Sequence, residues 1–138
     1  MFVVRRSNIV EHWNIENGSI IQQIRLPDLK TKLPHRYTGL YHFTKENAGS
    51  VMVSNNFGDV HLLPFDSLQE SNQQPECIRS FKIGEDIESV KVNFNNENEL
   101  AGGGECQPLR LWDINTGKKT WNSKNVSKSL FLHIPIQT

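Results

Sequence analysis

The feature that most constrains this chain is an internal repeat with a period of about 50 residues. Trp13 and Trp112 lie two periods apart in similar surroundings, and Leu63 holds the corresponding position in a middle copy. Each copy has the order strand, turn, apolar strand, turn, outer strand. A period near the ~40–45 residues of a propeller blade predicts four-stranded blades that stack face to face. The residues expected to shape the repeat are Trp13, Gly18, Gly102, Gly103, Trp112, Asp113 and Gly117.

Short segments of alternating apolar and polar residues, separated by polar turns, predict β-strands rather than helices. Asn17-Gly18 marks a tight hairpin turn, because both residues tolerate the positive φ that such a turn needs. Gly117 closes the equivalent turn of the last copy. Strands are expected over 9–15, 19–26, 38–43, 50–54, 59–65, 77–83, 88–94, 99–103, 108–114 and 119–125.

The repeat divides the chain into the end of one blade (1–27), a second blade (36–83), a third blade (87–126) and the start of a next blade or a tail (127–138). The predicted fold class is all-β, a partial propeller of antiparallel four-stranded blades. The chain is too short to close a ring, so its first and last blades are expected to leave an apolar face without a neighbour. We therefore expect the isolated chain to be poorly soluble, oligomeric or partly folded.

The net charge is +0, so no long-range field draws the whole chain to nucleic acid or to a membrane. Acidic residues nevertheless dominate 66–105, and basic residues dominate 106–138. In the basic segment a tryptophan stands among lysines, and an aromatic side chain among bases can stack on RNA. Solvated loop lysines and an edge-packing tryptophan are the simpler alternative. The candidate partner or RNA contacts are Lys118, Lys119, Trp121, Lys124 and Lys128.

No catalytic constellation is apparent, because no histidine lies in a motif with a nearby acid and nucleophile. Gly102-Gly103-Gly104 could cradle a phosphate, but the following Lys-Ser/Thr and helix are missing, so a tight inter-strand turn with positive φ is favoured. Cys77 and Cys106 stand outside any Cys/His cluster and are expected to be small buried hydrophobes in a reducing compartment. We expect no enzyme activity, cofactor or metal.

No stretch approaches the roughly 20 apolar residues that span a bilayer. The first apolar residues are followed by Arg5 and Arg6, the reverse of the order in a secretory signal peptide. A soluble intracellular protein is therefore expected.

Residues 99–121 read as the second half of a WD repeat, with small residues at the end of one strand, Trp112-Asp113 at the end of the next, and an Asn-Thr-Gly turn. The wider segment 100–136 resembles the WD-repeat-containing protein seventy-four family, whose fungal members are known as a Nop-seven-associated protein. The matching residues are Gly102-Gly103, 109–113, 124–126 and 130–136.

This resemblance implies a seven-bladed propeller that acts without catalysis as a scaffold in large ribosomal subunit biogenesis and rRNA processing, in the nucleus and its nucleolus. The implied partners are proteins of the pre-large-subunit ribosomal particle and an AAA-type ATPase, and a direct RNA contact stays open. A generic propeller adaptor for protein binding, an enzyme with a site on a propeller face, and a truncated fragment without function are the alternatives.

The chain departs from many WD repeats in one respect. Ser7, Phe57 and Cys106 stand where an Asp usually holds a hydrogen-bonded tetrad, and no Gly-His dipeptide is present. Apolar packing is therefore expected to supply most of the rigidity of each blade. The loop at Glu105 also lacks the basic residue of the family, which weakens any contact implied there.

Overall fold

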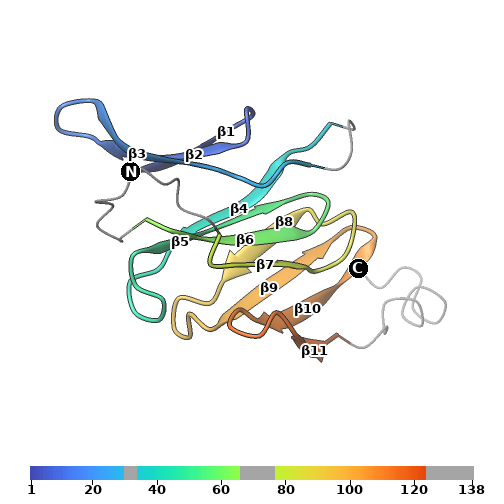
Figure 1. Cartoon of the computed structure of the whole chain (residues 1–138). Helices are drawn as coiled ribbons and strands as arrows, with labels where there is room; N and C mark the ends of the chain where they lie inside the picture. The colour runs from blue at the N-terminus through green and yellow to red at the C-terminus, as the bar shows by residue number, and fades with distance from the viewer. Residues whose placement is uncertain (30–33, 66–76, 124–138) are drawn as a thin grey trace, which may run out of the picture.

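Three antiparallel β-sheets form the chain in a computed structural model that describes residues 1–29, 34–65 and 77–123 (Figure 1). In each sheet every strand pairs with the strand before it in the sequence, so each sheet is a meander. No helix occurs in these ranges. The first sheet consists of β1 (Phe2–Arg5), β2 (Ile9–Asn14) and β3 (Ser19–Arg25); the second of β4 (Tyr37–His42), β5 (Ser50–Asn55), β6 (Asp59–Pro64) and β7 (Arg79–Lys82); the third of β8 (Ser89–Val92), β9 (Glu99–Gly104), β10 (Gln107–Asp113) and β11 (Lys119–Asn122).

The strand positions agree closely with the alternating pattern of the sequence, since every expected segment coincides with one of the strands β2 to β11. The all-β fold class is confirmed, and the second and third sheets have four strands each. Strand β1 is missing from the prediction, because its sequence Phe-Val-Val-Arg does not alternate between apolar and polar residues.

Two hairpin turns reproduce each other in detail. The amide of Gly18 donates to the carbonyl of Asn14 at 2.9 Å, and the amide of Gly117 donates to the carbonyl of Asp113 at 2.8 Å. Both glycines have positive φ, 68° and 71°. In both turns the side-chain oxygen of the first residue also accepts a bond from the amide two residues later. The prediction of a positive φ at Asn17 is wrong. The turn is longer than two residues, and only Gly18 has a left-handed backbone conformation.

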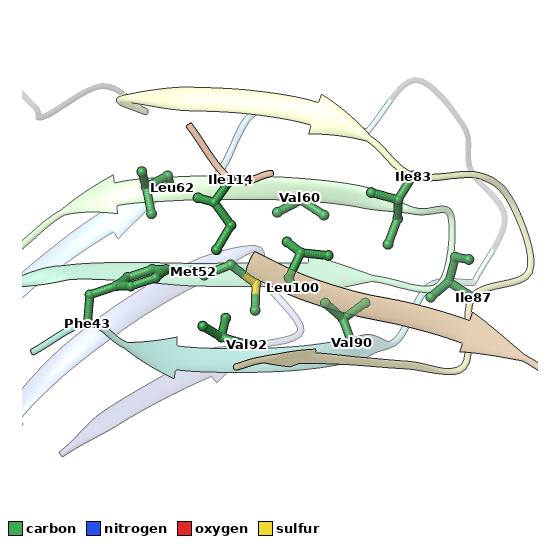
Figure 2. Close-up of a cluster of buried hydrophobic side chains, with 10 residues drawn as sticks. All are labelled: Phe43, Met52, Val60, Leu62, Ile83, Ile87, Val90, Val92, Leu100 and Ile114. Atoms are coloured by element: carbon green, nitrogen blue, oxygen red, sulfur yellow. The ribbon is translucent and has the colours of Figure 1, made fainter. Parts of the chain in front are cut away.

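The three sheets stack in chain order, and the second sheet is buried on both faces (Figure 1). Every residue of β5 is buried, and its side chains alternate between two interfaces. The first interface, between the first and second sheets, holds Val10, Ile24, Leu26, Val51, Val53, Leu63 and Phe65. The second interface, between the second and third sheets (Figure 2), holds Phe43, Met52, Val60, Leu62, Ile83, Ile87, Val90, Val92, Leu100 and Ile114.

A buried carboxylate ties the third sheet to the second. Glu97, in the loop between β8 and β9, is almost fully buried and accepts a hydrogen bond from the hydroxyl of Tyr41 on β4. The backbone amides of Thr44 and Lys45 donate to the same carboxylate at 3.2 Å and 2.6 Å.

Burial of Glu97 opposes its charged form, but these hydrogen bonds outweigh burial and hold the pKa of the carboxyl below its ordinary value. The bond to Glu97 in turn raises the pKa of Tyr41 to about 12. The second and third sheets are thus joined by polar contacts as well as by apolar packing.

Candidate interaction surface

The first sheet has a face, here called the front face, that no described residue covers. Ile15, Phe65 and Ile114 occupy equivalent positions of the repeat, each just after the apolar strand. Phe65 and Ile114 lie inside the two interfaces and are 6% and 0% exposed, whereas Ile15 is 72% exposed. The position is therefore buried wherever a preceding sheet is present. The front face comprises Glu11, Trp13, Ile15, Ile20 and Gln23.

The third sheet has an uncovered face of the opposite kind, here called the back face. Val10, Val60 and Leu109 are equivalent in the repeat. Val10 and Val60 are 0% and 1% exposed in the two interfaces, whereas Leu109 is 50% exposed because no described residue lies over it. The back face comprises Lys91, Ala101, Gly103, Leu109, Leu111 and Trp121.

A polar cluster covers the centre of the front face. The carboxylate of Glu11 accepts hydrogen bonds from Nε1 of Trp13 at 3.2 Å and from Nε2 of Gln23 at 2.6 Å, and Arg5 forms an ion pair with it. The hydrogen bond from Arg5 is the main reason that the pKa of Glu11 lies below its usual value. Glu11 is nearly buried, and these three side chains satisfy it without a neighbouring sheet.

A row of paired residues crosses the back face, and its last three members, Ala101, Leu111 and Trp121, form an apolar row. Backbone pairing joins Lys91 to Ala101, Ala101 to Leu111, and Leu111 to Trp121. Side chains of directly paired residues share one face of a sheet, so these four point away from the second sheet. Trp112, which follows Leu111, points the other way and packs against the second interface.

An open hollow of about 360 Å³ lies over β8 and β9 on this face. It is lined by Ser89, Lys91, Ala101, Gly103 and Leu109, among others. The hollow arises because β9 presents alanine and glycine to the back face.

The predicted basic contacts lie at the outer edge of the third sheet. Every residue of β11 is exposed, including Lys119 and Trp121, and Lys118 is exposed directly before it. The structure thus brings these three residues to one edge, where Trp121 ends the apolar row of the back face. Lys124 and Lys128 lie outside the described residues.

Trp13 and Trp112 are equivalent in sequence but differ in their surroundings. Trp112 is half-buried at the second interface. Trp13 is half-buried on the front face and belongs to neither interface. The reason is that Trp13 faces the side on which a preceding sheet would lie.

Two further expectations are wrong. Gly102, Gly103 and Gly104 lie within β9, none has positive φ, and they form neither a phosphate loop nor a turn. A Cβ atom at Gly102 would lie 2.7 Å from Cδ1 of Ile83, so this glycine makes room for the neighbouring sheet. Cys106 is exposed in the turn after β9 and is not a buried hydrophobe. Cys77 is half-buried and packs against the first interface.

The histidines of the described ranges make packing and hydrogen-bond contacts. His12 stacks on Phe2 with ring centroids 4.4 Å apart. Nδ1 of His61 lies 2.8 Å from Oγ of Ser80, and burial lowers the pKa of His61. Over residues 1–29, 34–65 and 77–123, no group of three or more His, Cys, Asp or Glu side chains could hold a metal ion. None of these residues forms a helix long and apolar enough to cross a membrane.

Comparison with known proteins identifies the fold. No family model matches the chain, and no curated protein matches it. Among solved structures, the chain is similar to the β-propeller domain of Cps50 (Swd1) from Myceliophteria thermophila, with a TM-score of 0.66 and 14% identity. The match covers 94% of this chain and 37% of that chain, so this chain spans little more than a third of the neighbour. The three sheets are thus a partial β-propeller, and membership of the ribosome assembly family is a proposal.

Proposed function

We propose that this chain is a non-catalytic propeller scaffold that binds protein and ribonucleoprotein partners during biogenesis of the large ribosomal subunit in the nucleolus. The observation that carries the proposal is the outer edge of the third sheet, where Lys118, Lys119 and Trp121 are all exposed. The resemblance of 100–136 to a family of ribosome assembly factors supports the choice of partner.

The chemistry of this edge suits a ribonucleoprotein surface. Lysine ammonium groups bind phosphate as flexible point charges. An exposed indole stacks on an unpaired base or packs against an apolar anchor of a protein. A pre-large-subunit particle offers phosphates, unpaired bases and protein surfaces together, whereas an uncharged protein partner would not use the lysines.

The test of the cellular role is sedimentation of the tagged protein from cell extract, combined with its localisation. The proposal predicts nucleolar signal and co-sedimentation with pre-large-subunit particles. The triple variant Lys118→Ala, Lys119→Ala and Trp121→Ala should lose most of this co-sedimentation. Lys82→Ala, which removes an exposed lysine from the outer strand of the second sheet, is the matched control and should behave like the parent.

The test of direct RNA contact is the salt dependence of binding to single-stranded RNA. Removing Lys118 and Lys119 should flatten the slope of log affinity against log salt by up to about 0.7 for each lost phosphate contact. Undetectable binding by the parent at low salt would contradict the RNA part of the proposal. Capture of proteins without any association with ribosomal particles would instead favour a generic adaptor.

A further inference from the structure

We propose that this chain associates with a second copy of itself head to tail, with the front face of one copy packed on the back face of the other. This inference goes beyond the proposed function, because it depends on Ile15, Leu109 and Leu111 at the end faces of the stack and not on Lys118 and Lys119. The back face shares Trp121 with the edge at β11. It extends to two copies a contact that the chain already makes twice within itself.

The two internal interfaces follow one pattern. At the second interface, Ile114 of the third sheet packs with Val60 and Leu62 of the second sheet, and Figure 2 shows Ile114 reaching toward both. At the first interface, Phe65 of the second sheet takes the place of Ile114, and Val10 of the first sheet takes the place of Val60. The same repeat positions therefore meet each time two sheets stack.

Each end face has one of the two sets of residues that meet at an internal interface. Ile15 on the front face is equivalent to Ile114, and Leu109 and Leu111 on the back face are equivalent to Val60 and Leu62. Head-to-tail stacking places Ile15 of one copy beside Leu109 and Leu111 of the other. Ile15 and Leu109 are among the most exposed large apolar residues of the described ranges, so this contact removes substantial apolar surface from water.

The polar residue in the front face is compatible with burial. Glu11, His61 and Arg110 occupy one repeat position. His61 is the strand partner of Val53 of the first interface, and the guanidinium of Arg110 lies beside Gly84, which follows the last strand of the second sheet. His61 is paired with Ser80, and Arg110 donates to Oε1 of Gln107 at 2.8 Å. Glu11 likewise has its own partners within the first sheet. Stacking therefore leaves the buried carboxylate of Glu11 paired. An unpaired buried charge, which is the usual cost of burying a carboxylate, does not arise.

The contact must be heterologous, because the front and back faces differ and neither is complementary to itself. An isologous dimer formed through the two back faces would leave Ile15 exposed on both front faces. The hollow over β8 and β9 borders the proposed contact, because Leu109 is one of the residues that line it. The part of the hollow over β8 has no counterpart strand in the first sheet, which has three strands.

The decisive experiment is complementation between two variants, measured by light scattering coupled to gel filtration over a concentration series. Ile15→Asp damages only the front face, and Leu109→Asp damages only the back face. Each variant alone should be monomeric. An equimolar mixture should regain a dimer that contains one of each, because each variant keeps the face that the other lacks.

Two controls keep the result interpretable. Phe94→Ser changes an equally exposed apolar residue in the loop between β8 and β9, away from both end faces, and should associate like the parent. Far-ultraviolet circular dichroism should show the same strand content for all variants, because both charged substitutions are at exposed positions. A monomeric parent chain, or parent-like association of Ile15→Asp alone, would overturn the proposal.

Discussion

The hydroxyl of Tyr41 donates a hydrogen bond to the carboxylate of Glu97, although the two residues are 56 positions apart in the sequence. Tyr41 lies on the first strand of the second sheet, and Glu97 lies in a loop of the third sheet. Charge-assisted hydrogen bonds to a buried carboxylate are strong. This pair therefore ties together two sheets whose strands are not hydrogen-bonded to each other.

Glu97→Gln is expected to destabilise the fold by about 2 kcal/mol, the typical value for hydrogen bonds to a charged group. The loss arises because the amide cannot satisfy the hydroxyl of Tyr41 and the amides of Thr44 and Lys45 equally well. The measurement is the urea unfolding midpoint at neutral pH. Glu105→Gln, at an exposed carboxylate, is the matched control and should unfold like the parent. An equal unfolding midpoint for both variants would show that the buried carboxylate of Glu97 does not stabilise the contact between the two sheets.

The contribution of Glu97 should also depend on pH. The pKa of this carboxyl is below its ordinary value of 4.5 in the folded chain. Its stabilising effect is therefore fully present above pH 4.5 and is lost as the pH falls through the folded pKa. The difference in unfolding free energy between parent and Glu97→Gln should be constant near neutral pH and shrink on acidification. A difference that grows on acidification would mean that the charged form is disfavoured in the folded chain.

Most of the fold could be predicted from the sequence because its signals are local. Alternation within each strand depends on residues close together in the sequence. The spacing of Trp13, Leu63 and Trp112 spans the whole chain, but it is visible because the same pattern recurs in each copy of the repeat. The pairing of Tyr41 with Glu97 could not be predicted, because neither residue lies in a repeated motif.

The burial of individual repeat positions could not be predicted from the sequence either. Ile15 matches Ile114 in the repeat, yet one is exposed and the other is buried. Their difference depends on whether a preceding sheet is present, which is a property of the stack and not of the strand. The candidate contacts Lys118, Lys119 and Trp121 could be named from composition, but the apolar row that ends at Trp121 needed the strand register.

Trp112→Ala should destabilise the chain far more than Trp121→Ala. Trp112 packs at the second interface, and its truncation should cost about 3 kcal/mol, the lower end of the range for a buried aromatic residue. Trp121 is 48% exposed on the back face, and its loss should cost about 1 kcal/mol or less. Chemical denaturation of both variants tests the difference. Equal shifts of the two unfolding midpoints would mean that Trp112 is not packed in the stack and Trp121 is not exposed on the back face.

Adjacent glycines of β9 provide a second test of the faces. Gly102→Ala places a methyl group 2.7 Å from Cδ1 of the buried Ile83 and should cost about 1–3 kcal/mol through overpacking. Gly103→Ala directs its methyl group to the back face, 3.4 Å from the nearest atom, and should be neutral or slightly stabilising. Thermal unfolding of the two variants gives the comparison, and the reverse order would contradict the assignment of the faces.

The central claim is that three sheets stack like successive propeller blades, with the second sheet buried on both faces. Hydrogen–deuterium exchange of backbone amides tests this claim most directly, since exchange reports the local opening of each strand. Amides of β5 should be the slowest, because every residue of that strand is buried. Amides of the fully exposed strand β11 should be among the fastest. Exchange from β5 that is as fast as exchange from β11 would contradict the stack.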